Sequence, residues 1–133
     1  MNGSKIDALA VSVSIQEEAS SLGFDWPDAF GVLGKIEEET GEIRMALEEG
    51  DGEQARRELG DLLLAAVNLS RFLKTDPNTE LARATERFSK RFAALQIELK
   101  RQGLEMKDCT LEELDAVWNT VKRGMECACE NGS

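Results

Sequence analysis

Histidine and tyrosine are absent from this chain of 133 residues, which also has only two prolines and three cysteines. Without histidine, the chain lacks the commonest general base and the commonest zinc ligand. An odd number of cysteines does not indicate a disulfide framework. Cys127 and Cys129 could bind a soft metal, but free thiols in a frayed tail are the simpler interpretation.

A long hydrophobic run is absent as well. The N-terminal stretch "IDALAVSVSI" is too short to span a bilayer and is interrupted by Asp7. It has neither a basic leader nor a clear cleavage signal. We therefore expect a cytoplasmic protein that does not enter a membrane.

Positive charge is in short supply. The chain has 16 basic and 26 acidic residues, which gives a net charge of −10. This balance argues against a protein that binds nucleic acid or an anionic membrane. A phosphate ligand is still compatible with it, provided that a divalent cation stands between the ligand and the carboxylates.

Helix-forming residues dominate the chain, and apolar residues recur at three- and four-residue steps. The predicted helices run from about Lys5 to Leu22, from Pro27 to near Gly50, from Glu53 to Lys74, from Pro77 to Gly103 and, briefly, from Thr110 onward. We predict an all-α fold with a four-helix-bundle-like core and a short fifth C-terminal helix. Residues 1–125 would form a single domain, and residues 126–133 a disordered tail.

The predicted helix ends carry specific signals. Gly23 suits the position just after a helix, where a left-handed backbone is common. Asp76 precedes Pro77 and is the predicted N-cap of the fourth helix. "TLEE" at Thr110–Glu113 fits a capping box and would open the last helix.

Acidic residues recur along one side of the second predicted helix. At about 100° per residue, Glu39 falls beside the apolar stripe of Ile36 and Ile43, and Glu42 lies one turn further on at its border. Glu38 lies off the centre of the stripe, on the side of Glu42. Two carboxylates three residues apart on a helix can bind one ion.

The third predicted helix repeats this arrangement within "ELGDLLLAAVNL", the most hydrophobic segment of the chain. Glu58 and Asp61 are three residues apart, and Asn68 follows seven residues after Asp61, so the three share a face. A short connection makes the second and third helices antiparallel neighbours. Four carboxylates therefore converge at the edge of the core: Glu39, Glu42, Glu58 and Asp61.

Carboxylates this close together in a poor solvent cannot all stay ionised without a partner. A bound cation resolves the conflict, and oxygen ligands without histidine or cysteine favour Mg²⁺, with Mn²⁺ as a possible substitute. The alternative is that an acidic run such as "EEETGE" is only a solvated helix face. Asp61 argues against that alternative, because it lies between Gly60 and a run of leucines.

The spacing of these acids resembles that of a known family. "EExxE" at Glu38–Glu42, followed by "ExxD" at Glu58–Asp61, is similar to the signature of the MazG-type all-α nucleoside triphosphate pyrophosphohydrolases. The segments "GFDWPD", "ELGDLLLAAVNLSRFL", "RATERFSKRF" and "LEELDAVWNTVKR" resemble the same family. The resemblance covers roughly residues 15–123 and points to the form found as the C-terminal half of two-domain MazG proteins.

The resemblance implies an enzyme that uses Mg²⁺ to hydrolyse a nucleoside triphosphate to the monophosphate and pyrophosphate, by attack of a metal-activated water on the α-phosphorus. The implied metal ligands are Glu39, Glu42, Glu58 and Asp61. Glu38 would bind a metal through water or orient the attacking water, and it counts with the ligands as a catalytic candidate. Asn68 would touch the substrate or a metal ligand.

Basic residues of the fourth predicted helix complete the implied site. Arg87 and Arg91 would hold phosphates, with Arg83 and Lys90 equally well explained as a solvated basic face. The family usually has lysine at the position of Arg87. The arginine keeps the charge, but it replaces a point donor by a planar fork.

Two further residues are candidates for substrate binding. Lys35 lies one turn before the first metal-ligand candidate of its helix and would contact phosphate. Trp118 would stack on the base, as would Trp26, although core or interface packing is an alternative for each tryptophan. The sequence does not rank nucleobases, because a base pocket is built from ordinary packing residues.

The implied role is the house-cleaning of nucleotide pools. Alternatives are a phosphoribosyl-ATP pyrophosphohydrolase or dUTPase-like enzyme, and a catalytically weak helical dimer that binds nucleotides as a regulator. The third predicted helix is apolar around nearly its full circumference, which four short helices in a monomer hardly bury. Because family members are dimers or tetramers, we expect a homodimer or a homotetramer.

Overall fold

The chain folds into helices. The structure, a computed structural model, describes the backbone of residues 5–132 and the side chains of residues 5–126. Within that part, the elements are α1 (Ala8–Ser21), α2 (Ala29–Glu48), α3 (Gly52–Phe72), α4 (Pro77–Arg101), the 3₁₀ helix η1 (Met106–Asp108) and α5 (Leu111–Gly132). These residues contain no strand, and the all-α prediction is confirmed. None of the helices among them combines the length and apolar character needed to cross a membrane.

Aspartates cap most of the helices at their N-termini. The carboxylates of Asp7, Asp28 and Asp51 accept hydrogen bonds from backbone N–H groups in the first turns of α1, α2 and α3, at 3.0, 3.1 and 3.0 Å. Asp76 accepts from Thr79 N at 2.9 Å, so the predicted cap of α4 is confirmed. The predicted capping box of α5 is confirmed too: Thr110 N donates to Glu113, and Glu113 N donates to Thr110 Oγ1.

Several helix limits differ from the prediction. Helix α1 begins at Ala8 rather than Lys5. Helix α2 begins at Ala29 rather than Pro27, because Asp28 has an extended backbone and caps the helix from outside. Helix α5 continues to Gly132 and so includes residues 126–132, which were predicted to belong to a disordered tail. No proline follows Thr110 to interrupt it. The side chains of Cys127 and Cys129 lie outside the described part of the chain.

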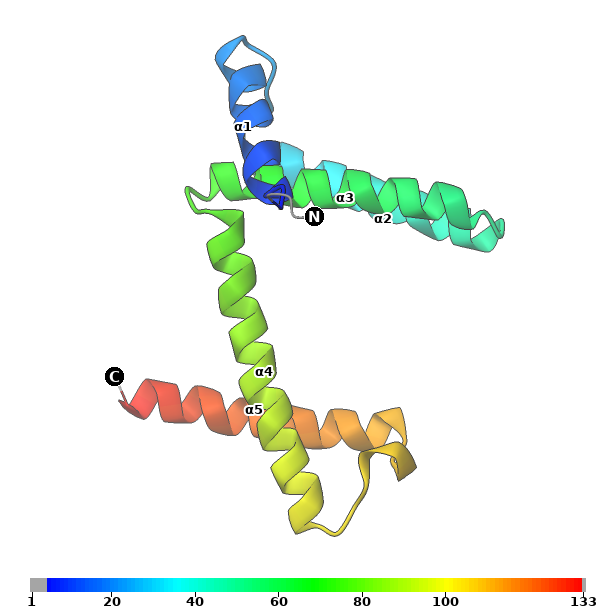
Figure 1. Ribbon diagram of the computed structural model, residues 1–133, viewed down its shortest axis with the longest axis vertical. Coiled ribbons are helices and arrows are strands. Elements are labelled where there is room, and N and C mark those ends of the chain that lie inside the picture. Colours follow the sequence, from blue (N-terminus) through cyan, green and yellow to red (C-terminus); the bar gives the residue numbers. More distant parts are fainter. Residues whose placement is uncertain (1–4, 133) are drawn as a thin grey trace. The chain divides into compact units, whose positions relative to one another are not determined.

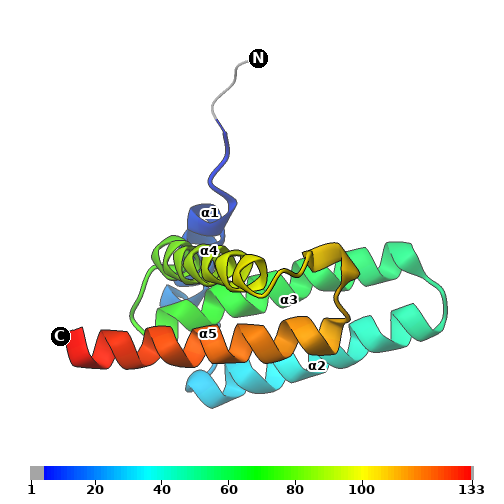
Figure 2. The same ribbon diagram turned by 90° about the horizontal axis from the view of Figure 1, so that it is seen from below.

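Two compact units make up the chain, Met1–Glu80 and Leu81–Ser133. In the first unit, α2 and α3 form an antiparallel hairpin and lie side by side, in two views related by a quarter turn (Figures 1 and 2). The buried apolar side chains of these two helices are small or branched: Val32, Ala46, Ala55, Ala65 and Val67. Helix α1 packs on α3. The predicted pairing of the two acid-bearing helices is therefore confirmed.

The second unit contains most of α4 together with α5. Leu95 and Leu99 of α4 are buried. The ring of Phe88 contacts that of Trp118 on α5, with 5.3 Å between the centroids. Arg91 forms an ion pair with Glu126 of α5 at 3.6 Å.

Two glycines of α2 allow a matched test of the contact that positions Trp26. A Cβ atom at Gly31 would lie 3.0 Å from Trp26 Cε3, whereas one at Gly34 would meet nothing within 4 Å. Replacing a helical glycine by alanine stabilises a helix by about 0.5–1 kcal/mol when the space is free. We therefore expect Gly34→Ala to raise the free energy of unfolding by about that amount, and Gly31→Ala to raise it less or to lower it.

Chemical denaturation followed by circular dichroism measures both changes. Tryptophan fluorescence in a Trp118→Phe background reports the environment of Trp26, which should change in Gly31→Ala only. Equal stabilisation by the two substitutions, with no change in fluorescence, would show that Trp26 does not lie against Gly31.

Candidate metal centre

Three carboxylates meet between α2 and α3. Glu39 comes from α2, and Glu58 and Asp61 come from α3. One oxygen of each lies within 4.8 Å of those of the other two. The three-residue spacing on α3 places its two acids on the side that faces α2, and the hairpin brings Glu39 opposite them.

Two of these acids are buried with an oxygen unpaired. Glu39 is 3% exposed and Glu58 is 7% exposed. Glu58 accepts a hydrogen bond from Gln54 Nε2 at 2.6 Å. The second carboxylate oxygen of each glutamate has no hydrogen-bond partner among the described residues. Because burying an unpaired carboxylate is costly, the arrangement favours an additional positive charge at this place.

Lys35 supplies one positive charge to the group. Its ammonium donates to Glu39 at 3.0 Å and to Glu38 at 3.2 Å. Both contacts raise the pKa of Lys35 above its usual value, and the contact with Glu39 has the larger effect. A single lysine does not balance Glu38, Glu39, Glu58 and Asp61 together.

The other two candidate acids lie outside the group of three. Glu42, one turn after Glu39, is half-buried and does not belong to the cluster of mutually close oxygens. Glu38 is exposed and is reached by Lys35. The structure thus brings together three of the four expected ligands.

The chemistry of the donors fits a hard divalent cation. All three close ligands offer carboxylate oxygen, the donor that Mg²⁺ and Mn²⁺ prefer. The two orphaned glutamate oxygens are the positions that such an ion would satisfy. Asp61 is exposed, so the group is accessible from one side.

A cavity of about 400 Å³ lies against these acids. Its lining includes Lys35, Glu39, Asp61 and Asn68. A second cavity of about 300 Å³ is lined by Asp25 and Arg71 among others. Four residues line both cavities: Gln16, Phe24, Trp26 and Asn68. Both cavities are formed entirely by the first unit.

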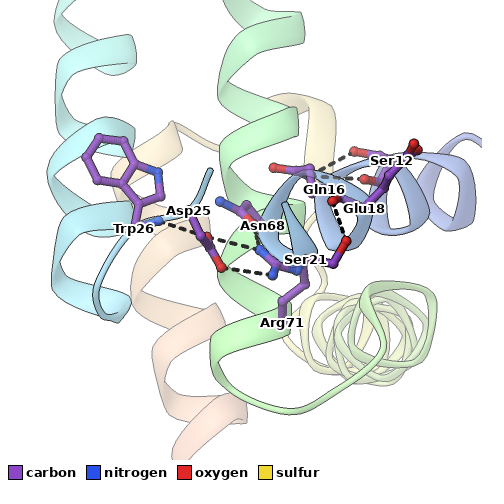
Figure 3. A network of polar contacts seen from close by, with 8 residues as sticks. All are labelled: Ser12, Gln16, Glu18, Ser21, Asp25, Trp26, Asn68 and Arg71. Carbon is purple, nitrogen blue, oxygen red and sulfur yellow. Dashed lines mark hydrogen bonds and ion pairs between the residues drawn. The ribbon is translucent and has the colours of Figure 1, made fainter. Parts of the chain in front are cut away.

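Asp25, Asn68 and Arg71, which line the second cavity, belong to one polar network (Figure 3). Arg71 forms an ion pair with Asp25, with 3.0 Å between Nη2 and Oδ2, and its Nη1 donates to Asn68 Oδ1 at 2.5 Å. Neither Asp25 nor Arg71 was predicted from the sequence to belong to a site. Arg71 follows Asn68 by three residues and so shares its helix face, a signal that could have identified it. Asp25 lies 46 residues away from Arg71 along the chain.

The remaining candidates belong to the second unit. Arg87 is exposed on α4, and Arg91 is half-buried and paired with Glu126. Trp118 is half-buried and contacts Phe88. This contact corresponds to the core packing that the sequence analysis gave as the alternative to base stacking. The contacts of Arg91 and Trp118 thus lie within their own unit.

The ion pair of Asp25 should make stability depend on pH. Hydrogen bonds from Arg71 and then Ser20 lower the pKa of Asp25 to about 2, from 3.8. A carboxyl group with a lowered folded-state pKa contributes stability above its unfolded pKa and loses it as the pH falls toward the folded value. We expect the wild type to lose more stability than Asp25→Asn between about pH 4 and pH 2.

Denaturant titrations at several pH values measure this difference. Asp115→Asn, at an exposed position of α5, is the control for removing one carboxyl group. Parallel pH profiles for the wild type and Asp25→Asn would contradict the assignment.

Comparison with known proteins relates this geometry to a family. The MazG nucleotide pyrophosphohydrolase domain matches residues 31–94, which contain all five candidate acids. The chain is 42% identical over 121 residues to the nucleoside triphosphate pyrophosphohydrolase/pyrophosphatase MazG of Thermotoga maritima, covering 91% of this chain and 46% of that protein. It is 37% identical over 120 residues to a nucleoside triphosphate pyrophosphohydrolase of Escherichia coli K12, covering 89% and 46%. The chain thus spans about half the length of these relatives.

Proposed function

The chain carries a MazG nucleotide pyrophosphohydrolase domain, and on that premise we propose that it hydrolyses nucleoside triphosphates to the monophosphate and pyrophosphate. The observation that carries the proposal is the group of Glu39, Glu58 and Asp61, with two buried oxygens unpaired. A polyphosphate ligand needs cations beside such acids, and the cavity against them has the volume of a small-molecule site.

Mg²⁺ is the cation that we propose, with Mn²⁺ as a substitute. Glu39, Glu58 and Asp61 would hold it, and Glu42 would join through a change of side-chain rotamer. When bound, such an ion neutralises phosphate charge and lowers the pKa of a water molecule. The proposal is supported by the all-carboxylate donor set.

The chain's own residues would bind and orient the substrate. Lys35 would exchange a contact with Glu38 or Glu39 for a phosphate oxygen, since its flexible stem reaches both acids already. Glu38, released from Lys35, would orient the attacking water. Asn68 lines the same cavity as the acids and would touch the substrate.

The family resemblance suggests roles for three residues of the second unit. Arg87 and Arg91 would stabilise the charge that develops on the leaving pyrophosphate. Trp118 would stack on the base. These three roles come from the family resemblance and from the residue types.

A panel of nucleotides tests the proposal. Ribo-, deoxyribo- and oxidised nucleoside triphosphates are incubated with the full chain and Mg²⁺, and the products are separated by ion-exchange chromatography. We expect nucleoside monophosphate and pyrophosphate, and no turnover with excess chelator. Release of the diphosphate and orthophosphate would contradict the proposal. Nucleotide binding by calorimetry with no product would indicate a regulator instead.

We also propose that the chain associates at least into a homodimer. Leu59, Leu63 and Leu64 on α3 are 49%, 55% and 45% exposed in the described chain. Several large apolar side chains exposed together on one helix are unusual on the surface of a monomer. Light scattering should give a mass at least twice the 14.7 kDa of one chain, and a monomer would contradict this proposal.

A further inference from the structure

Asn68 stands where the two cavities of the first unit meet. It lines both of them, and it is 7% exposed. Its amide can be oriented in two ways, and the choice decides whether it offers a donor or an acceptor to a ligand. The neighbouring arginine settles that choice.

Arg71 can only donate hydrogen bonds. Its Nη1 lies 2.5 Å from the side-chain oxygen of Asn68, so the amide carbonyl must face the guanidinium. The NH₂ group of Asn68 then points the other way, toward the side on which Trp26 lies in Figure 3. Among the described residues, that nitrogen has no hydrogen-bond partner, and it is therefore available to a ligand.

Asp25 holds Arg71 in place. Its two carboxylate oxygens accept from Nη2 at 3.0 Å and from Nη1 at 3.4 Å. The side chain of Arg71 is only 13% exposed, and its guanidinium lies over the ring of Phe72 at 5.5 Å. A paired and half-buried arginine of this kind loses little further freedom when it orients a neighbour.

The distance along α3 between Asp61 and Asn68 indicates which part of a ligand Asn68 can reach. Asn68 follows Asp61 by seven residues, which is two helical turns or about 10 Å. An ion with ligand bonds of about 2.1 Å cannot bridge that separation. A nucleotide whose phosphates lie at the acids would instead place its nucleoside part beside Asn68.

We propose that Arg71, fixed by Asp25, is a positioning residue: it orients the Asn68 amide so that its NH₂ group donates a hydrogen bond to an acceptor on the nucleoside part of the bound nucleotide. This inference rests on the proposed function. The competing explanation is that Arg71 only ties the α1–α2 connection to α3 and thereby stabilises the first unit. Both explanations expect Arg71 substitutions to lower thermal stability, so stability alone does not separate them.

A double-mutant cycle separates them. The variants are Arg71→Met, Asn68→Ala and the double substitution, with Arg57→Met, at an exposed position of α3, as the control for loss of a cation. Binding of the α,β-methylene analogues of ATP and dTTP is measured by calorimetry with Mg²⁺, well below the unfolding temperature. KM and kcat are measured on the corresponding triphosphates.

We expect Asn68→Ala and Arg71→Met each to weaken analogue binding by up to about tenfold, the worth of one hydrogen bond. In the Asn68→Ala background, Arg71→Met should have no further effect. KM should rise while kcat changes little, because Asn68 is remote from the acids. If Arg71→Met does not fold, Arg71→Lys keeps the charge and is placed in the same cycle.

Additive effects of the two substitutions would overturn the inference, since a structural or purely electrostatic role of Arg71 persists without Asn68. Additivity in an active wild type leaves the proposed function intact. Binding of the analogues without hydrolysis of the corresponding triphosphates would overturn the proposed function, while the cycle still decides the role of Arg71. A wild type that neither binds nor hydrolyses these nucleotides would overturn both.

Discussion

Asp61→Asn and Glu39→Gln are each expected to lower kcat by about 10³-fold or more with Mg²⁺ as the cofactor. Each substitution removes one anionic oxygen from a group of three that lie within 4.8 Å of one another. A metal ion contributes several kcal/mol to stabilising charge in a transition state, and each ~1.4 kcal/mol is a factor of ten in rate. No other single substitution in the site should cause a larger loss of activity.

The same variants should keep their helix content. In the presence of a chelator, Asp61→Asn removes one of three mutually repelling carboxylates, so its unfolding temperature should equal or exceed that of the wild type. Circular dichroism and thermal unfolding, with and without Mg²⁺, measure both effects. The wild type should gain stability from Mg²⁺ through mass action, and the two variants should gain less.

Glu37→Gln is the matched control. Glu37 is an exposed acid on α2, two residues before Glu39, and its replacement changes the net charge by the same amount. We expect wild-type turnover for this variant. Unchanged turnover in both Asp61→Asn and Glu39→Gln would refute the assignment of the metal centre.

Arg87→Met is expected to lower kcat by about 10²-fold. Removing one preorganised donor from a group that stabilises developing charge typically costs about 10²–10³ in kcat. Arg87 is exposed on α4, so its loss should leave the packing of Leu95 and Leu99 intact. Steady-state kinetics on the preferred triphosphate, together with thermal unfolding, measure the two effects separately.

Two further variants sharpen the test of Arg87. Arg87→Lys restores the charge and introduces the residue that the family usually has, so most of the activity should return. Lys90→Met is the control: Lys90 is 64% exposed and pairs with Glu86 of its own helix at 3.1 Å, and its removal should change kcat by less than about twofold, as for an exposed ion pair. Equal losses in Arg87→Met and Lys90→Met would indicate a general charge effect.

The sequence alone was sufficient for the helices and for most of their ends. Caps such as Asp76 and Thr110 act on backbone groups within three residues, so they can be identified without knowing the fold. Helical periodicity likewise placed Glu58 and Asp61 on one face, and a short turn at Gly50 implied that this face meets α2. These inferences use only local geometry, which is the same in every protein.

The tertiary structure decided which side chains actually meet. Glu42 has the right spacing but lies outside the group of three. The spacing of Lys35 alone suggested a phosphate contact, but in the structure its side chain pairs with the buried Glu39. The link from Asp25 through Arg71 to Asn68 joins residues 46 positions apart. Such contacts depend on rotamers and on how the α1–α2 connection meets α3, and neither has a local signal in the sequence. The order of residues along the chain thus determined which acids share a helix face. Packing determined how the Asn68 amide is oriented.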